Sequence, residues 1–313
     1  MKDKIYLFGV DVGGTGIKIG LFKKDGELVE KWEIPTNVRN GGNEILPDIA
    51  KALKEKMIEK GITAEEMIGV GIGVPGPVDE KGVVHRCVNL GWGTFSIVDC
   101  LSELINMPIK AGNDANVAAL GEMWKGCAMG CSSLVFITLG TGIGGGVIVD
   151  KKVVTGENGS GGEIGHITVN INEEAICNCG KQGCVEQYAS ATGMVRMAKK
   201  IIEEGKENSS LDIRKPLTAK AIVDEAKNGD SVALQVVDIM GKTLGLALGA
   251  ATCMVDPQVI LIGGGVSKAG DIVLEAIEKH YRMYAFHATR NTPIKLATLG
   301  NDAGIYGAAR QLL

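Results

Sequence analysis

The stretch "DVGGTGIKIG" (residues 11–20) decides the fold prediction. It lies where two apolar runs meet, "KIYLFGVDV" (4–12) and "IKIGLF" (17–22), and both runs are typical of buried strands. Three glycines surround Thr15 and allow a tight turn between these strands: Gly13, Gly14 and Gly16. The backbone N–H groups of such a turn can face a phosphate. The stretch therefore predicts a strand–turn–strand unit, which is either an ordinary hairpin or a phosphate-binding loop.

The same pattern returns later in the chain. The β-rich run "SLVFITL" (133–139) leads into "GTGIGGG" (140–146), which matches "GTGIKIG" (14–20) as G-T-G-I-x-x-G. Two such loops, each flanked by apolar strands, indicate an internal duplication. The repetition favours phosphate binding over a plain hairpin for the second loop as well, at Gly140, Thr141 and Gly142.

The rest of the pattern completes two α/β halves. In the first half, a helical spacing over 43–61 precedes a strand at 68–74, and a strand at 108–112 leads into a helix. The second half contains two helices, a strand and glycine turn, a further strand and a final helix: 218–230, 231–255, 257–267, 293–299 and 303–313. We expect a smaller α/β domain formed by residues 1–112 with 299–313, and a larger α/β domain formed by 113–298.

Composition limits the function classes. The net charge of −4 gives no basic surface for nucleic acid. No apolar run is long enough to predict a membrane span, and Asp11 interrupts the apolar N-terminus before any signal-peptide cleavage site. These features favour a cytoplasmic protein, in which eight cysteines are not expected to form a disulfide framework.

Three of the cysteines form a block, "CNCGKQGC" (177–184). The spacing C-x-C-x₄-C lacks the C-x-x-C of a thioredoxin-like redox pair. Zinc prefers thiolate and imidazole ligands and usually takes four of them in a structural site. The block therefore predicts a zinc site formed by Cys177, Cys179, Cys184 and one ligand from elsewhere.

Five segments together resemble a known superfamily. Asp11–Thr15, Leu139–Gly146 and "ILIGGGVS" (260–267) are similar to the first phosphate, second phosphate and adenosine motifs shared by sugar kinases, heat-shock chaperones and actin. Within that superfamily, "GEIGH" (162–166) and "CNCGKQGCVE" (177–186) resemble the ROK family. The resemblance extends from residue 5 to the C-terminus and keeps the family's motif order.

The resemblance implies an actin-like ATPase (ribonuclease H-like) duplicated fold, in which two α/β domains enclose a cleft. It also implies sugar phosphorylation that depends on ATP and Mg²⁺, usually by a homodimer or a higher homo-oligomer. Some ROK members are instead sugar-responsive repressors with an N-terminal helix-turn-helix. The first phosphate strand begins by residue 5 here, so we expect no such segment.

On the nucleotide side, Asp11 is expected to hold Mg²⁺ through water and Lys18 to supply a cation near the phosphates. Gly16 departs from the family, in which threonine or lysine often follows "GGT". The "ASATG" turn (189–193) resembles the family's second nucleotide-side turn. We expect ribose and adenine to lie near three glycines, for which helix caps and packing turns are the alternative: Gly193, Gly264 and Gly265.

On the sugar side, Asp114 matches the family's catalytic aspartate and is expected to act as general base towards the substrate hydroxyl. A residue at this strand-to-helix junction is otherwise an ordinary helix cap, and Asn113 beside it is expected to cap the helix or bind sugar. The resemblance implies further sugar contacts by Asn89, Glu163, His166 and Glu186. It also implies that Gly76 allows the backbone to approach the sugar ring. Trp92 is expected to be a packing residue.

The resemblance also supplies the fourth zinc ligand. His85, His280 and His287 have no motif around them, whereas His166 lies in "GEIGH", upstream of the cysteine block. A site with four protein ligands is structural, so the ion would tie together the segments that carry Glu163, His166 and Glu186.

The intact motifs favour a glucose-like pyranose, and the expected reaction converts glucose and ATP to glucose 6-phosphate. N-acetylmannosamine and fructose remain alternative acceptors within the same family. A non-catalytic sugar-sensing regulator of the same fold remains the alternative from a different class.

Overall fold

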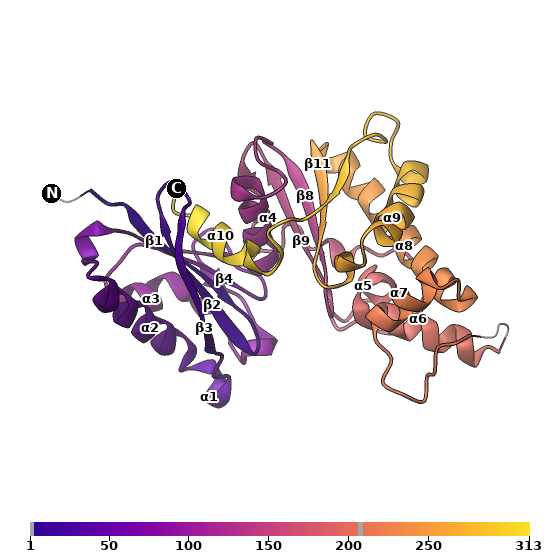
Figure 1. Cartoon of the computed structure of the whole chain (residues 1–313), viewed down its shortest axis with the longest axis horizontal. Coiled ribbons are helices and arrows are strands. Elements are labelled where there is room, and N and C mark those ends of the chain that lie inside the picture. The colour runs from indigo at the N-terminus through magenta and orange to yellow at the C-terminus, as the bar shows by residue number, and fades with distance from the viewer. Residues whose placement is uncertain (1–2, 206–208) are drawn as a thin grey trace. The chain divides into compact units, whose positions relative to one another are not determined.

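The computed structural model describes residues 3–205 and 209–313. The chain divides into two compact units. Unit 1 consists of Met1–Gly130, Lys152–Gly161 and Leu299–Leu313, and unit 2 consists of Cys131–Lys151 and Gly162–Thr298. Figure 1 shows that the C-terminal helix, in yellow, packs beside the indigo N-terminal strands, so unit 1 contains segments from both the first and the last part of the chain.

Unit 1 is built on a mixed sheet with the strand order β3-β2-β1-β4-β7. The first three strands form an antiparallel meander, and β4 and β7 extend it in parallel with β1. The bounds of the strands are Tyr6–Val12 for β1, Gly16–Lys23 for β2, Leu28–Pro35 for β3, Met67–Val74 for β4 and Ile109–Asn113 for β7.

Helices cover both faces of this sheet because the side chains of β1 alternate between two apolar clusters. Phe8 and Val10 share one cluster with residues of α2 and α3, whereas Leu7 packs with Ile305 of α10. Gly9 of β1 lies directly against the α10 backbone, where a Cβ would overlap the Ile305 carbonyl. The helices are α1 (Arg39–Gly42), α2 (Ile45–Lys60), α3 (Ile97–Ile105), α4 (Asp114–Lys125) and α10 (Ala303–Arg310), and the short strands β5 (Val83–Val84) and β6 (Phe95–Ser96) pair with each other. The short strand β10 (Lys152–Val153) instead lies at the edge of the second five-stranded sheet, beside β9.

Unit 2 repeats the arrangement. Strand β8 pairs antiparallel with β9 and parallel with β11, and β11 pairs parallel with β12. These strands span Leu134–Leu139 (β8), Ile143–Val149 (β9), Val259–Gly263 (β11) and Ile294–Leu296 (β12). The helices are α5 (Glu186–Ala189), α6 (Ala191–Glu203), α7 (Ala219–Lys227), α8 (Ser231–Val255) and α9 (Asp271–Tyr284).

The order β2-β1-β4-β7 in unit 1 and the order β9-β8-β11-β12 in unit 2 have the same directions. This correspondence confirms the duplicated, actin-like α/β fold. Both G-T-G-I stretches lie at the same place in their sheets, at the turn from the first strand to the second.

The division into units differs from the predicted boundary after residue 112. Helix α4 and the residues up to Gly130 belong to unit 1. The physical reason is that α4 packs against α10: a Cβ on Gly121 would overlap the Ala303 carbonyl, and a Cβ on Gly307 would overlap the Val117 carbonyl. Two helices that approach so closely through glycines form one packing unit.

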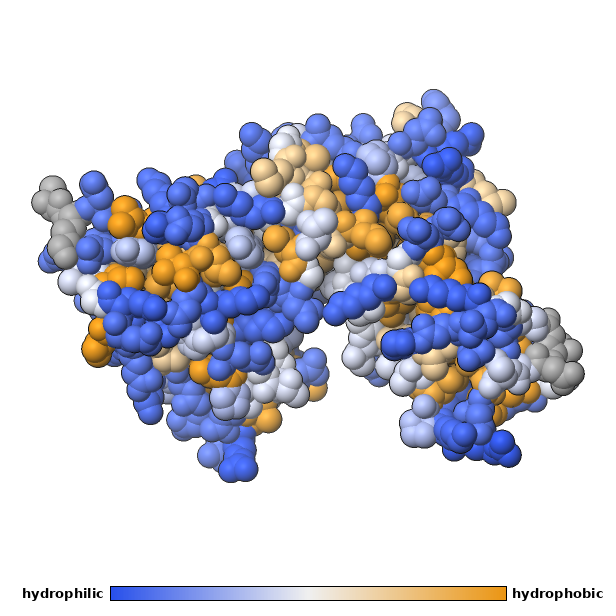
Figure 2. Space-filling view, viewed as in Figure 1, coloured by the Kyte–Doolittle hydropathy of each residue, from blue (hydrophilic) through white to orange (hydrophobic). Residues whose placement is uncertain are grey.

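Helix α8 has the length and the apolar composition of a membrane span, although the sequence pattern predicts none. However, 61% of its most apolar window is buried inside the protein, and its residues contribute to the core of unit 2. This burial is typical of the core helix of a soluble protein. In the view of Figure 2, hydrophilic residues dominate the surface of both units.

Candidate active site

The first G-T-G-I turn is a tight hairpin in unit 1. Gly13 donates its N–H to the Gly16 carbonyl at 3.0 Å, which leaves Gly14 and Thr15 exposed at the tip. Thr36, which follows β3, supports the hairpin through its hydroxyl, which donates to the Gly13 carbonyl at 2.7 Å. The tip thus offers backbone and a hydroxyl to a ligand on a rigid support, as a phosphate-binding loop requires.

Three charged residues on neighbouring strands lie opposite one another near this hairpin. Asp11 on β1 is paired with Lys18 on β2, and Lys18 is paired with Glu33 on β3. Burial raises the pKa of the Asp11 carboxyl, while the Lys18 charge acts in the opposite direction. The Lys18 ammonium donates to the Asn301 carbonyl at 3.2 Å, just before α10.

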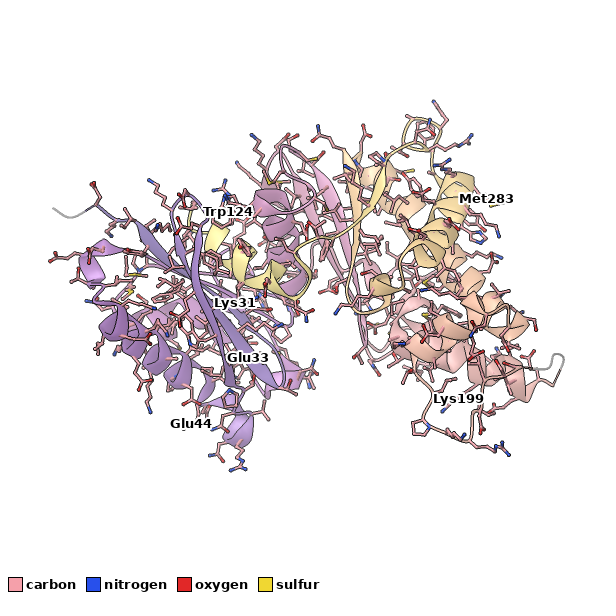
Figure 3. All side chains as sticks on the ribbon, in the orientation of Figure 1. Lys31, Glu33, Glu44, Trp124, Lys199 and Met283 are labelled. Atoms are coloured by element: carbon pink, nitrogen blue, oxygen red, sulfur yellow. The ribbon has the colours of Figure 1, made fainter. Side chains whose placement is uncertain are left out.

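Glu33 also accounts for the glycine at position 16. A Cβ on Gly16 would overlap the Glu33 carboxylate, so the larger residues of the family pattern would displace that side chain. Figure 3 labels Glu33 together with Lys31, which forms a 2.6 Å ion pair with Asp302. Gly16, where the family pattern often has threonine or lysine, therefore leaves a space that the Glu33 carboxylate fills.

The junction of β7 and α4 holds the proposed base. Asn113 is the N-cap of α4, and its Oδ1 accepts the N–H groups of Ala115 at 3.0 Å and Asn116 at 3.1 Å. Its Nδ2 donates to the Gly76 carbonyl at 3.1 Å and to Asp114 Oδ1 at 2.9 Å. The capping prediction for Asn113 is confirmed, and the same amide orients the Asp114 carboxylate.

Asp114 is held at the first turn of α4, where the N–H of Ala115 donates to its Oδ1 at 2.8 Å. A carboxylate at a helix N-terminus is stabilised in its charged form by the unpaired N–H groups there. Gly76 has a φ of +94°. A Cβ at this position would lie 2.7 Å from the Arg86 carbonyl, so only glycine fits beside Asn113 without strain.

Asn89 lies exposed on the 3₁₀ turn Val88–Leu90. Trp92 follows it and is only 5% exposed, and its indole N–H donates to the Gly42 carbonyl at 3.0 Å. The ring packs edge-on against Phe95, with centroids 5.2 Å apart. Trp92 is therefore a packing residue, as the sequence predicts, and it anchors the loop that presents Asn89.

The second G-T-G-I turn lies in unit 2 and is held by the segment after the cysteine block. The carboxylate Oε2 of Glu186 accepts the Ile143 N–H at 2.8 Å. Ala191 donates its N–H to the Gly140 carbonyl at 2.9 Å, and the Thr192 hydroxyl donates to the Thr141 carbonyl at 2.8 Å. Three residues of this turn are thus attached to residues 186–192.

A cavity of about 600 Å³ in unit 2 opens beside this turn, and this volume is within the range of small-molecule sites. The predicted residues Gly140, Thr141 and Gly265 all line it. Gly264 has a φ of +87°, and a Cβ there would lie 2.5 Å from the Leu139 amide nitrogen. The second phosphate turn and the adenosine turn therefore meet at one cavity.

Gly193 is placed differently. It is buried in α6, and a Cβ there would lie 2.6 Å from the Glu186 carbonyl, so its contacts are those of a packing glycine. The sequence interpretation missed several residues of the cavity lining, which include Thr218, Lys220, Asp224, Lys227 and Lys268. The helical spacing of "TAKAIVDEAK" (218–227) indicates an amphipathic helix but not which face lines a cavity.

The four predicted metal ligands lie together in unit 2. Their donor atoms are all within 4.8 Å of one another: His166, Cys177, Cys179 and Cys184. The Sγ atoms of Cys179 and Cys184 are 3.6 Å apart, and His166 Nδ1 lies 3.9 Å from Cys177 Sγ. Ligands at about 2.3 Å from a tetrahedral ion are separated by roughly 3.8 Å, so these residues fit a zinc ion.

Backbone pairing brings His166 to the cysteines across the sequence. Val185 donates its N–H to the Ile167 carbonyl at 3.0 Å, and Val169 donates to the Gly183 carbonyl at 2.8 Å. Burial and the neighbouring thiols raise the pKa of the Cys184 thiol to about 12.

Glu163 lies beside the histidine ligand. Its Oε2 is 3.9 Å from His166 Nε2, the nitrogen that faces away from Cys177. Burial raises the pKa of Glu163, the Glu186 charge adds to this effect, and His166 opposes it. A carboxylate on the outer side of a ligating histidine orients the ring.

The sequence interpretation also missed a polar network that supports the metal-binding segment. Arg196 of α6 donates to Glu173 Oε2 at 2.8 Å, and the Tyr188 hydroxyl donates to the same oxygen at 2.5 Å. The hydrogen bond from Arg196 lowers the pKa of Glu173 to about 2, and burial opposes that change. Glu173 lies in the chain between His166 and Cys177, outside both sequence motifs.

Fold and site together define a protein of the actin-like phosphotransferase class, with two phosphate-type turns, a nucleoside-sized cavity and a Cys₃His cluster. The chain belongs to the ROK family, whose model matches residues 7–312.

Three relatives illustrate the similarity. A glucokinase of Halalkalibacterium halodurans is 45% identical over 98% of this chain and 94% of that protein. The crystal structure of a ROK family glucokinase from Streptomyces griseus in complex with glucose and AMPPNP has a TM-score of 0.78 and 32% identity, and 98% of each chain is covered. A xylose repressor of Caldicellulosiruptor bescii is 30% identical over 100% of this chain and 79% of that protein.

Proposed function

We propose that this chain is an ATP-dependent glucokinase that transfers the γ-phosphoryl group of ATP to the 6-hydroxyl of glucose. The observation that carries the proposal is the Asp114 carboxylate, oriented at the start of α4 by Asn113 and Ala115. The glucokinases among its relatives, which match nearly the full chain, support glucose as the acceptor.

In the proposed reaction the glucose 6-hydroxyl oxygen attacks the γ-phosphorus, its proton passes to Asp114, and ADP leaves. Enzymes achieve phosphoryl transfer mainly by positioning and by electrostatic stabilisation, with little covalent chemistry by the protein. Because Asp114 Oδ1 is fixed by two donors, the carboxylate keeps one orientation towards the hydroxyl. We assign the sugar hydroxyls to the residues that match the family's sugar contacts, with Gly76 beside the ring: Asn89, Asn113, Asp114, Glu163, His166 and Glu186.

For ATP, we assign the phosphates to the two turns and the nucleoside to the cavity in unit 2. The first turn contributes Gly13, Gly14 and Thr15, and the second contributes Gly140, Thr141 and Gly142. Gly264 and Gly265 shape the cavity wall, and Gly193 supports it by packing. Lys18 contributes positive charge beneath the first turn.

We assign Mg²⁺ to Asp11. Its carboxylate is the hard oxygen donor that Mg²⁺ prefers, and it lies against Gly304, where a Cβ would be 2.5 Å from Oδ2. The ion, when bound, neutralises charge on the β- and γ-phosphates. We also infer that His166, Cys177, Cys179 and Cys184 hold a structural zinc ion, which keeps Glu163, His166 and Glu186 in place.

We further propose a cytoplasmic homodimer. The reducing cytoplasm suits eight cysteines that form no disulfide among the described residues. Exposed apolar side chains at the ends of α8 and α9 support self-association, among them Met254, Met283 and Phe286. Figure 3 labels Met283 on the outer side of α9. A monomeric mass in light scattering at micromolar concentration would contradict the dimer.

A coupled ADP-release assay over glucose, mannose, fructose and N-acetylmannosamine tests the acceptor. We expect the largest kcat/KM for glucose. If N-acetylmannosamine or fructose is preferred, the enzyme is the corresponding kinase and the glucose assignment is wrong. A chain that binds glucose but releases no ADP with any sugar would instead be a non-catalytic sensor, an alternative that the similarity to a repressor keeps relevant.

A further inference from the structure

The carboxylate of Glu186 connects two parts of unit 2 that the proposed function treats separately. Its Oε2 accepts the Ile143 N–H at 2.8 Å, at the end of the second phosphate turn. Its Oε1 lies 3.8 Å from Cys177 Sγ, at the metal cluster. We propose that Glu186 is a positioning residue for the second phosphate turn, so that nucleotide binding depends on it even when no sugar is present.

The close approach of Gly142 supports this inference. A Cβ at Gly142 would overlap Oε2 of Glu186, so a glycine at this position lets the carboxylate approach the turn. Hydrogen bonds to charged groups are stronger than those between neutral groups. The Glu186 carboxylate therefore fixes the direction of the Ile143 N–H and, with it, the backbone of Thr141 and Gly142.

Residues that follow Glu186 hold the remainder of the turn. The Thr192 hydroxyl donates to the Thr141 carbonyl at 2.8 Å, and Ala191 donates to the Gly140 carbonyl at 2.9 Å. Ser190 ties this segment back to Glu186, because its hydroxyl donates to the Glu186 carbonyl at 2.7 Å. The turn is thus attached to one short segment that starts two residues after the metal ligand Cys184.

The consequence concerns the role of the cysteine cluster. The resemblance assigns Glu186 to the sugar, and a zinc ion would then serve the sugar site alone. The hydrogen bonds of the second turn extend that role to the nucleotide, because the same carboxylate fixes the turn that lines the nucleoside cavity.

The test is a calorimetric titration of the full-length, metal-loaded protein with AMPPNP and Mg²⁺ in the absence of sugar. Glu186→Ala removes the acceptor of the Ile143 N–H, and we expect the affinity to fall about tenfold. Glu186→Gln keeps an oxygen acceptor at the same position, and we expect AMPPNP affinity within about twofold of the wild type. The same Gln variant should raise the glucose KM, because the charge is lost.

Thr192→Val removes the hydroxyl bond to Thr141 and should weaken AMPPNP binding about threefold. Its matched control is Thr243→Val, because that hydroxyl bonds within α8 to the Ile239 carbonyl and should leave binding unchanged. If Glu186→Ala does not fold, the AMPPNP affinities of Thr192→Val and Glu186→Gln test the inference instead. Unchanged affinity in Thr192→Val, or a tenfold loss in Glu186→Gln, would overturn the inference.

The inference rests on the proposed function only for the identity of the nucleotide. A wild-type chain that binds AMPPNP without phosphorylating any sugar would contradict the kinase proposal and leave the positioning role of Glu186 intact. Glucose phosphorylation by the wild type, with AMPPNP affinity unaffected in Glu186→Ala or in Thr192→Val, would reject the positioning role alone.

Discussion

The two G-T-G-I turns have the same local sequence and the same place in their sheets, but they are supported in different ways. The first turn is held by its own meander, through Thr36 after β3. The second is held by residues 186–192, which lie far along the chain and next to the metal ligands. A short motif therefore specifies the shape of a turn, whereas the residues packed around the turn decide which other parts of the protein hold it in place.

The largest expected effect tests the base, which lies in the unit of the first turn. Asp114→Asn keeps the size of the side chain but cannot accept the hydroxyl proton, so kcat should fall about a thousandfold. Glucose binding, measured by calorimetry, should persist, because the proposed hydroxyl contacts of Asn89 and Asn113 are unchanged. The exposed Asp150→Asn serves as control. An unchanged kcat in Asp114→Asn would reject the base assignment.

The next effect tests the metal site, which lies beside the support of the second turn. Cys184→Ser, or removal of the metal by a chelator, should raise the KM for glucose at least tenfold, because the cluster orients Glu163, His166 and Glu186. Plasma emission spectroscopy checks the zinc content, and Cys253→Ser at the exposed end of α8 is the matched control. A lower kcat with no change in either KM would contradict a positioning role for the metal.

A smaller effect concerns acid stability. The folded-state pKa of Glu173 is about 2, below its ordinary value of 4.5. Its ion pair with Arg196 therefore stabilises the fold fully above pH 4.5, and this contribution is lost as the pH falls towards 2. Glu173→Gln should cost on the order of 2 kcal/mol at pH 7 and flatten this dependence in denaturant unfolding. Glu174→Gln, at an exposed neighbour, should retain the wild-type slope.

The smallest effect compares the supports of the turns directly. Thr36→Val removes the hydroxyl bond to Gly13 and should cost about 1 kcal/mol, seen as a severalfold higher KM for ATP. In the double mutant with Cys184→Ser, the effect of Thr36→Val on the KM for ATP should be additive. In the double mutant of Thr192→Val with Cys184→Ser the two effects should not be additive, because Thr192 and the metal both support the second turn. Additivity in both cycles would mean that the two turns do not differ in their support.

Periodicity and motif repetition were sufficient to predict the main strands of both halves, because each strand and turn is encoded within a few residues. The metal ligands could be gathered by resemblance, and the structure confirms that they lie together. The place of α4 in unit 1 was not predictable, since it depends on how Gly121 and Gly307 let two distant helices approach. The Glu173–Arg196 pair was missed for the same reason, because nothing in the local sequence of either residue indicates its partner.

The sequence by itself determined the main strands and helices and the two glycine turns, because local spacing and repeated motifs encode them. Only the tertiary structure decided that Glu33 fills the space beside Gly16, that Lys220 and Lys268 share a cavity with Gly265, and that Glu186 holds Ile143. These relations join segments far apart in the chain, and they arise from packing and hydrogen bonding after the strands have come together.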